Sequence, residues 1–282
     1  MVSGVRVSNE TVPLALDAPR GGFTFMMQPG SWGSWVFTID GIEHNATSGV
    51  NSVRFGAGGF QEARGTGGPT KGGGGFYCSH RRELLDSVGE FYHDNVSNVL
   101  YLAVASPASS DSSLPGLLFV PQVAQLFRVE GSQVDPVVAV RVGGVTIAHA
   151  RPTYMSPYTV PSGGDYSVHR GGAIHLNGTA NSTVDACLFD RVGGNAIWLT
   201  DFNRFARIAG NHIRFPGENG VGLTGSTVWV DGTGGNQPRR NTIEGNLIHH
   251  VGLYTKQACA VFYATSAENV VQGNILFHGP RA

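Results

Sequence analysis

A short pattern recurs four times between residues 171 and 282, and it limits what this chain can fold into more than any other feature. In each copy an aliphatic residue stands three positions before a Cys, in the first copy, or an Asn, in the other three. The copies are spaced by 24, 35 and 28 residues, which is the period of stacked repeat architectures. The aliphatic anchors are Val184, Ile208, Ile243 and Val271.

A second pattern of alternating aliphatic residues precedes three of the anchors, at 173–176, 196–199 and 260–263. These segments are short, rich in β-branched residues and bounded by polar turns, which is typical of strands. Strands that recur in every coil predict a parallel β-helix, and the crossover rule makes it right-handed. We expect the Asn residues to occupy tight left-handed turns and to form a ladder of stacked amides.

The composition agrees with a tall stack of strands and tight turns. The chain has 282 residues, of which 41 are Gly, and only 14% are charged. A net charge of −1 lacks the basic surface that nucleic acid binding requires, and no apolar run reaches the length of a transmembrane span. The sequence therefore predicts neither a nucleic acid partner nor a membrane span. The three cysteines match no zinc spacing, and no metal or cofactor is predicted.

The chain divides into three parts. Residues 1–30 are rich in Pro and Gly and are expected to be irregular. Residues 31–123 form a β-rich part, with a Gly-rich loop at 65–75 and a β-hairpin within 90–103. Residues 124–282 form the β-helix.

Two further expectations concern the ends of the chain. The last repeat stops without the polar cap that a solenoid needs, so the chain is expected to be a fragment of a longer protein. Five Asn-X-Ser/Thr sequences suit an extracellular or cell-surface location, although the first residues lack the pattern of a signal peptide.

One column of side chains is predicted to face outward from the strands. Because side chains alternate along a strand, the two aliphatics of each segment point inward and the residue between them points out. Trp198 is then either exposed, where its flat face suits a sugar ring, or covered by a neighbouring loop. Three long loops, at 151–170, 225–240 and 249–259, are expected to form the walls of a groove beside this column. The column contains His175, Trp198, Gly222 and Phe262.

Carboxyl groups beside this column could support hydrolysis of a glycosidic bond, which needs one protonated and one ionised carboxyl group. The candidates nearest the column are Asp201, Glu218 and Asp231. A separation of ~5–5.5 Å between two of them would indicate retention of configuration, and ~6.5–9.5 Å inversion. The alternative for each residue is a solvated turn or a cap.

Other residues are predicted to bind substrate, with Trp198 and Phe262 stacking on sugar rings and polar side chains binding hydroxyls or acidic groups. A lyase acting on uronates would instead use Lys256 or Arg170, often with Ca²⁺, but the sequence has no dense Asp cluster for that ion. If the backbone is extended there, the adjacent His249 and His250 point to opposite faces, so no shared metal is expected. The polar set is His175, Asp165, His169, Arg170 and Lys256.

Several longer motifs resemble right-handed parallel β-helix proteins of the pectin-lyase-like superfamily, and in particular large members close to β-helical glycoside hydrolases. The resemblance covers roughly residues 32–282, although Val88 stands where such proteins usually have Pro before Gly-Glu. It implies the fold, a carbohydrate-directed activity and a hairpin that interrupts early coils. The superfamily also includes lyases, esterases, epimerases and phage adhesins. The motifs lie at 89–94, 163–173, 193–196, 231–235, 256–257 and 279–282.

The function that the sequence favours is a polysaccharide-directed glycoside hydrolase that acts through paired carboxylates. The alternatives are a non-catalytic glycan-binding or structural β-helix, and a polysaccharide lyase that uses Lys256. In all three cases the expected partner is a polysaccharide or another glycan.

Overall fold

The computed structural model describes residues 4–8, 21–27, 33–45, 47–61, 75–104, 118–161 and 167–281. These residues form two compact units. The second contains the described residues from Val120 onward together with Gly33, Ser34, Phe60 and Gln61, and the first contains the other described residues up to Phe119. No helix in the described part of the chain is long and apolar enough to cross a membrane.

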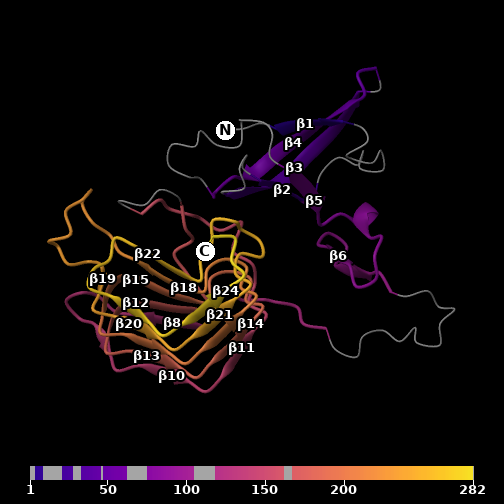
Figure 1. The fold of residues 1–282 in the computed structure, drawn as a ribbon. Helices are drawn as coiled ribbons and strands as arrows, with labels where there is room; N and C mark the ends of the chain where they lie inside the picture. The colour runs from indigo at the N-terminus through magenta and orange to yellow at the C-terminus, as the bar shows by residue number, and fades with distance from the viewer. Residues whose placement is uncertain are drawn as a thin grey trace. The chain divides into compact units, whose positions relative to one another are not determined.

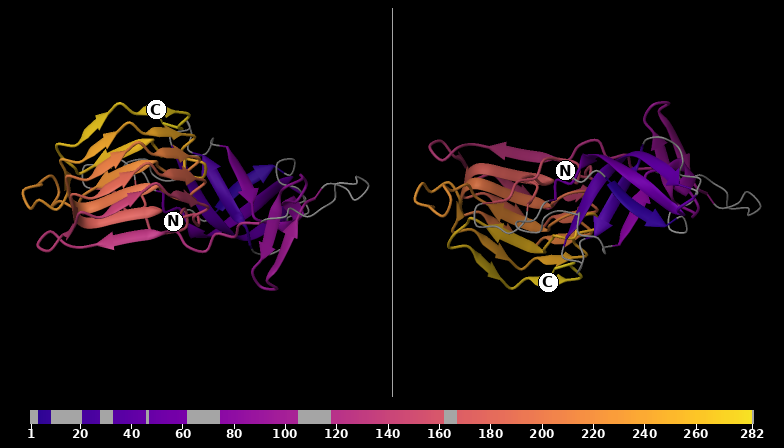
Figure 2. Two further views of the ribbon diagram at one scale, coloured as in Figure 1. Left: turned by 90° about the horizontal axis from the view of Figure 1, so that it is seen from below. Right: turned by 90° about the horizontal axis from the view of Figure 1, so that it is seen from above.

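The second unit is a stack of coils whose strands form three parallel sheets (Figure 1, Figure 2). One sheet contains β10 (Arg141–Gly143), β13 (Thr183–Asp185), β16 (Arg207–Ala209), β20 (Thr242–Glu244) and β23 (Val270–Gln272). Another contains β11 (Thr146–Ala148), β14 (Leu188–Asp190), β17 (His212–Arg214), β21 (Leu247–His249) and β24 (Ile275–Phe277). The third contains β8 (Phe127–Glu130), β12 (Ile174–Ala180), β15 (Ile197–Arg204), β18 (Val221–Thr224) and β22 (Val261–Ala264), with β9 (Val137–Val138) beside β12 and β19 (Pro238–Arg239) beside β15.

The four aliphatic anchors of the sequence pattern pair directly with one another from coil to coil. The pairs are Val184–Ile208, Ile208–Ile243 and Ile243–Val271, all in parallel register. The side chains of Val184, Ile208 and Ile243 point into the stack, where they share one core with buried aliphatic and aromatic side chains of the other two sheets, whereas Val271 on the last coil is 41% exposed. The predicted all-β class and the parallel β-helix are therefore confirmed.

The predicted Asn ladder is present inside the stack. The backbone N–H and the side-chain amide of Asn211 both donate to Oδ1 of Asn246 at 2.9 Å, and Asn246 makes the same two bonds to Asn274. Asn was also predicted to occupy the left-handed position of the turn, and this part of the prediction was wrong, because the left-handed residue is the glycine before each Asn. Gly210 and Gly245 have φ of 62°, a conformation that Gly adopts without a steric penalty.

The first unit contains a five-stranded sheet with the strand order β1-β4-β3-β2-β5. Trp35, Phe37, Ile39 and Val53 are among the side chains that form its core. Residues 1–30 were expected to be irregular, but two strands of this sheet lie there: one alternates Val with polar residues, and the other, Phe-Thr-Phe-Met-Met, is largely apolar. The strands are β1 (Gly4–Ser8), β2 (Phe23–Met27), β3 (Ser34–Asn45), β4 (Val50–Gly58) and β5 (Phe76–Ser79).

The predicted hairpin is also present, as β6 (Phe91–Asp94) paired antiparallel with β7 (Val99–Leu102). A short 3-10 helix, η3 (Arg82–Leu84), precedes it. The hairpin lies between β5 and β8 in the chain. The Gly-rich loop at 65–75 falls outside the described residues, apart from Gly75.

Candidate functional site

The predicted outward column forms on the third sheet of the stack. His175 pairs with Trp198, Trp198 with Gly222, and Gly222 with Phe262. Of the two alternatives for Trp198, the structure shows the covered one, since its side chain is fully buried against Val168. The indole lies over Gly222, where an added Cβ would come within 2.0 Å of it.

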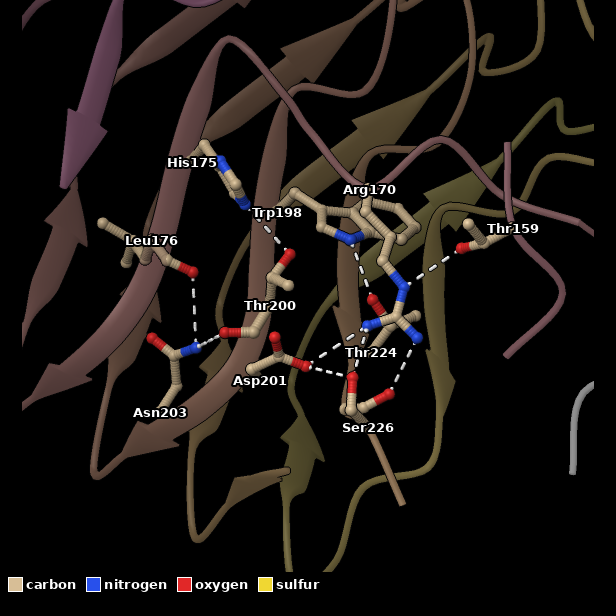
Figure 3. Close-up of polar contacts among 11 residues, drawn as sticks. Thr159, Arg170, His175, Leu176, Trp198, Thr200, Asp201, Asn203, Thr224 and Ser226 are labelled. Atoms are coloured by element: carbon tan, nitrogen blue, oxygen red, sulfur yellow. Dashed lines mark hydrogen bonds and ion pairs between the residues drawn. The ribbon is translucent and has the colours of Figure 1, made fainter. Parts of the chain in front are cut away.

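Two contacts fix the indole of Trp198 in this position. Its Nε1 donates to Oγ1 of Thr224 at 3.0 Å (Figure 3). Its ring stacks on Phe262 with centroids 6.0 Å apart and planes 15° apart. Trp198 therefore positions neighbouring strands and presents no free ring face to a sugar in this conformation.

His175 is also inside the structure, with only 7% of its surface exposed. Its Nε2 lies 2.9 Å from Oγ1 of Thr200, whereas the buried Nδ1 has no hydrogen-bond partner among the described residues (Figure 3). Burial, and next the charge of Arg128, lower the pKa of His175 to about 4. The imidazole is therefore neutral near pH 7.

Asp201 lies at a bulge of β15, where two residues of this strand oppose the single Gly178 of β12. Its backbone is left-handed, with φ of 57°, and bulges of this kind redirect a side chain. The Oδ1 atom accepts hydrogen bonds from Ser226 Oγ at 2.6 Å and from Arg170 at 3.3 Å (Figure 3). The carboxylate is about one quarter exposed.

Arg170 joins three segments of the chain at this point. Besides Asp201, its guanidinium donates to Oγ1 of Thr159 at 3.2 Å (Figure 3). It also donates to the carbonyl of Gly225 at 2.8 Å. Burial lowers the pKa of Arg170, and Asp201 opposes that shift. Arg170 thus links the loops at 151–170 and 225–240, and their role as the walls of a groove stays a prediction.

Glu218 lies in a buried network of hydroxyl donors. Its Oε1 accepts hydrogen bonds from Thr153 at 2.5 Å and from the Tyr158 hydroxyl at 2.6 Å, and the residue is 1% exposed. Burial raises the pKa of Glu218, although His169 and the two hydroxyls oppose the shift. Burial and the adjacent carboxyl group raise the pKa of Tyr158 well above its usual value, so the phenol stays protonated and donates.

Asp231 makes the contacts of a turn residue. Its Oδ1 accepts from the backbone N–H of Thr233 at 2.9 Å and from its hydroxyl at 2.6 Å. These hydrogen bonds lower the pKa of the exposed Asp231 carboxyl group. Asp231 thus closes a turn, which agrees with the alternative prediction of a solvated turn residue.

The remaining predicted ligands lie on the loops. His169 is within 3.0 Å of the Pro157 carbonyl, and Lys256 Nζ donates to the Gly252 carbonyl at 2.8 Å. Burial lowers the pKa of Lys256. The ring of Tyr154 meets that of Tyr254 edge to face at 5.4 Å, so the loops at 151–170 and 249–259 also come together. Asp165 lies outside the described residues.

The prediction that His249 and His250 point to opposite faces is wrong. His250 has a left-handed backbone, with φ of 53°, and the two Nδ1 atoms lie 2.7 Å apart. Nε2 of His249 lies 2.9 Å from that of His212, which adds a third imidazole. No group of three or more possible metal ligands converges among the described residues.

The sequence did not indicate the partners of Glu218. Thr153 and Tyr158 are 65 and 60 residues away in the chain and belong to a segment without a strand repeat. No periodic signal places such a segment over the stack. Gln61, from a still earlier part of the chain, contacts the same segment as Thr153 and Tyr158, because its side-chain amide donates to the Tyr154 carbonyl at 2.5 Å.

Comparison with known proteins supports the fold and little beyond it. No protein-family model matches the sequence, and no curated protein matches it significantly. A solved structure named glycoside hydrolase superposes with a TM-score of 0.70 at 18% sequence identity, and the match covers 92% of this chain and 50% of that one. The chain therefore spans about half the length of that protein. At this identity the likeness concerns the fold.

Proposed function

We propose that this protein binds a polysaccharide beside the third sheet of the stack and hydrolyses its glycosidic bonds with Asp201 and Glu218. The observation that carries the proposal is the contrast between these two carboxyl groups. Burial raises the pKa of Glu218, which favours the protonated acid, whereas Asp201 accepts hydrogen bonds from a guanidinium and a hydroxyl. Glycosidases need one carboxyl group of each kind.

The two residues then take different roles. Glu218 gives its proton to the glycosidic oxygen as the bond to the leaving sugar breaks, and because this residue is 1% exposed, the step requires the covering segment with Thr153 and Tyr158 to move aside. Asp201, oriented by Arg170, either removes a proton from the attacking water or attacks the sugar carbon itself, in which case water then breaks the bond between the sugar and Asp201. The fold shared with a solved protein named glycoside hydrolase supports the same class of substrate.

A second function, glycan binding without hydrolysis, is favoured by the burial of Glu218. This residue is 1% exposed, and Asp201 already has two side-chain partners. In that case the two carboxyl groups hold the surrounding loops in place, and the protein retains a glycan without cleaving it.

The two functions are separated by an assay on neutral and uronate-containing polysaccharides that records new reducing ends and the ultraviolet absorbance of unsaturated uronates. We expect reducing ends without absorbance. Asp201→Asn and Glu218→Gln should each lower the rate by about a hundredfold or more. Glu244→Gln is the matched control, because Glu244 pairs with Arg207 on a different sheet. Rising absorbance would identify a lyase, and glycan binding without either signal would leave the binding function.

A further inference from the structure

The loop that follows β18 carries an exposed tryptophan on a firmly held base. Arg170 binds the Gly225 carbonyl at 2.8 Å, and Arg204 binds the carbonyls of Gly235, at 2.7 Å, and Gln237. At the tip, a backbone bridge joins Val228 to Asp231, and Trp229 between them is 79% exposed. The base is thus fixed by two guanidinium groups while the indole stands in solvent.

A cavity of 360 Å³ lies beside this indole. Its volume is in the range of small-molecule sites. Aromatic, aliphatic, hydroxyl and amide side chains line it, and none of the described lining residues is charged. The lining includes Thr227, Trp229, Gln237, Thr265 and Ser266.

Two of these side chains hold oxygen atoms without a partner. Oε1 of Gln237 and Oγ of Ser266 are buried and make no hydrogen bond to the described residues. Unsatisfied buried polar atoms are uncommon because each costs free energy. Both atoms belong to residues that line the open cavity, so a small side-chain rotation would turn either oxygen toward a ligand there.

We propose that this cavity is a subsite for a neutral sugar unit of the glycan. A pyranose ring has an apolar C–H face that suits the Trp229 indole, and hydroxyls that suit the unpartnered oxygens of Gln237 and Ser266. The absence of charge among the described lining residues favours a neutral sugar over a uronate. Thr227 directly follows Ser226, which binds Asp201, so the subsite adjoins the candidate carboxylate along the chain. That this subsite belongs to the path of a polysaccharide substrate rests on the proposed function.

Calorimetric titration with neutral hexasaccharides of glucose, mannose and xylose, and with oligogalacturonate, tests the subsite. Trp229→Ala should weaken binding of the preferred neutral oligosaccharide at least tenfold, and Trp229→Phe should recover part of the loss. Phe277→Ala is the control, since Phe277 is an exposed aromatic residue on another sheet, and it should bind as the wild type does. Unchanged affinity in Trp229→Ala, or a wild type that binds only the oligogalacturonate or none of the four, would overturn the subsite.

Ser266→Ala separates a binding role from a structural one. Its oxygen has no partner in the described protein, so removing it should weaken sugar binding several-fold without lowering the melting temperature. A lower melting temperature with unchanged affinity would contradict the proposal. Product formation by Asp201→Asn is followed separately. If that variant loses hydrolysis while Trp229→Ala binds normally, the subsite fails and the proposed function stands. If Trp229→Ala loses binding while Asp201→Asn still hydrolyses the glycan, the subsite stands and the proposed function fails.

Discussion

Arg170 donates to Oδ1 of Asp201 at 3.3 Å and, through its other terminal nitrogen, to the Gly225 carbonyl at 2.8 Å. One guanidinium therefore orients the candidate carboxylate and holds the loop that begins after β18. Because 21% of the Arg170 side chain and 26% of the Asp201 side chain are exposed, solvent screens this pair only in part.

Replacing Arg170 with Met should therefore reduce the stability of the protein. We expect the free energy of unfolding to fall by about 1–2 kcal/mol, because Asp201 and the Gly225 carbonyl lose a charged donor. Chemical denaturation measures this loss. Arg191→Met is the matched control, since Arg191 is 58% exposed in its pair with Asp190 and should change stability by less than about 0.5 kcal/mol. Equal losses of unfolding free energy in both variants would show that the Arg170 contacts stabilise the fold no more than an exposed ion pair does.

Glu218 should make stability depend on pH in the direction set by its raised pKa. A carboxyl group with a higher pKa in the folded state stabilises the fold below its ordinary pKa of 4.5, and this contribution is lost as the pH rises through the folded value. Glu218→Gln keeps the acceptor for Thr153 and Tyr158 but cannot ionise. The melting temperature of this variant should therefore rise relative to that of the wild type as the pH is raised from 4 to 8. A constant difference across that range would contradict the assignment.

The Asn ladder gives a prediction about the interior of the stack. Asn246 is 1% exposed, accepts two bonds from Asn211 and donates to Asn274. Asn246→Ala should cost about 2–4 kcal/mol of unfolding free energy, because it leaves buried donors of Asn211 without an acceptor. Denaturant unfolding measures the cost, and Thr146→Ala on the exposed face of β11 serves as the control. A loss below about 1 kcal/mol would mean that the neighbouring coils satisfy these donors in another way.

The sequence predicted the parts of this structure that repeat and missed the parts that do not. Val184, Ile208 and Ile243 were aligned correctly because the same inward position recurs in every coil, and parallel pairing keeps it in register. The burial of Trp198 depends on Val168, which lies in a segment without that periodicity. Glu218 is likewise explained only by Thr153 and Tyr158, which no local pattern connects to it.

The same limit applies to the loops and their exposed residues. Asp231 and Trp229 are two residues apart, yet one closes a turn and the other lines a cavity. Their roles depend on the left-handed backbone of Trp229, with φ of 57°, and on the bridge between Val228 and Asp231. These contacts form within one turn whose sequence carries no standard turn motif, so composition and spacing do not reveal them.

His175 should destabilise the protein at acid pH. Burial and then the charge of Arg128 lower its pKa to about 4, while Glu130 and Asp201 act in the opposite direction and His169 adds to the decrease. A base with a lowered folded-state pKa takes up a proton more readily in the unfolded chain. The stability that it contributes above pH 6.5 is therefore lost as the pH falls toward 4.

His175→Gln removes the titrating group and should flatten the dependence of unfolding free energy on pH between these values. His278→Gln is the control, because His278 is exposed on the last coil, and it should retain the wild-type slope in that interval. The same slope in His175→Gln and wild type would assign the acid sensitivity to other groups.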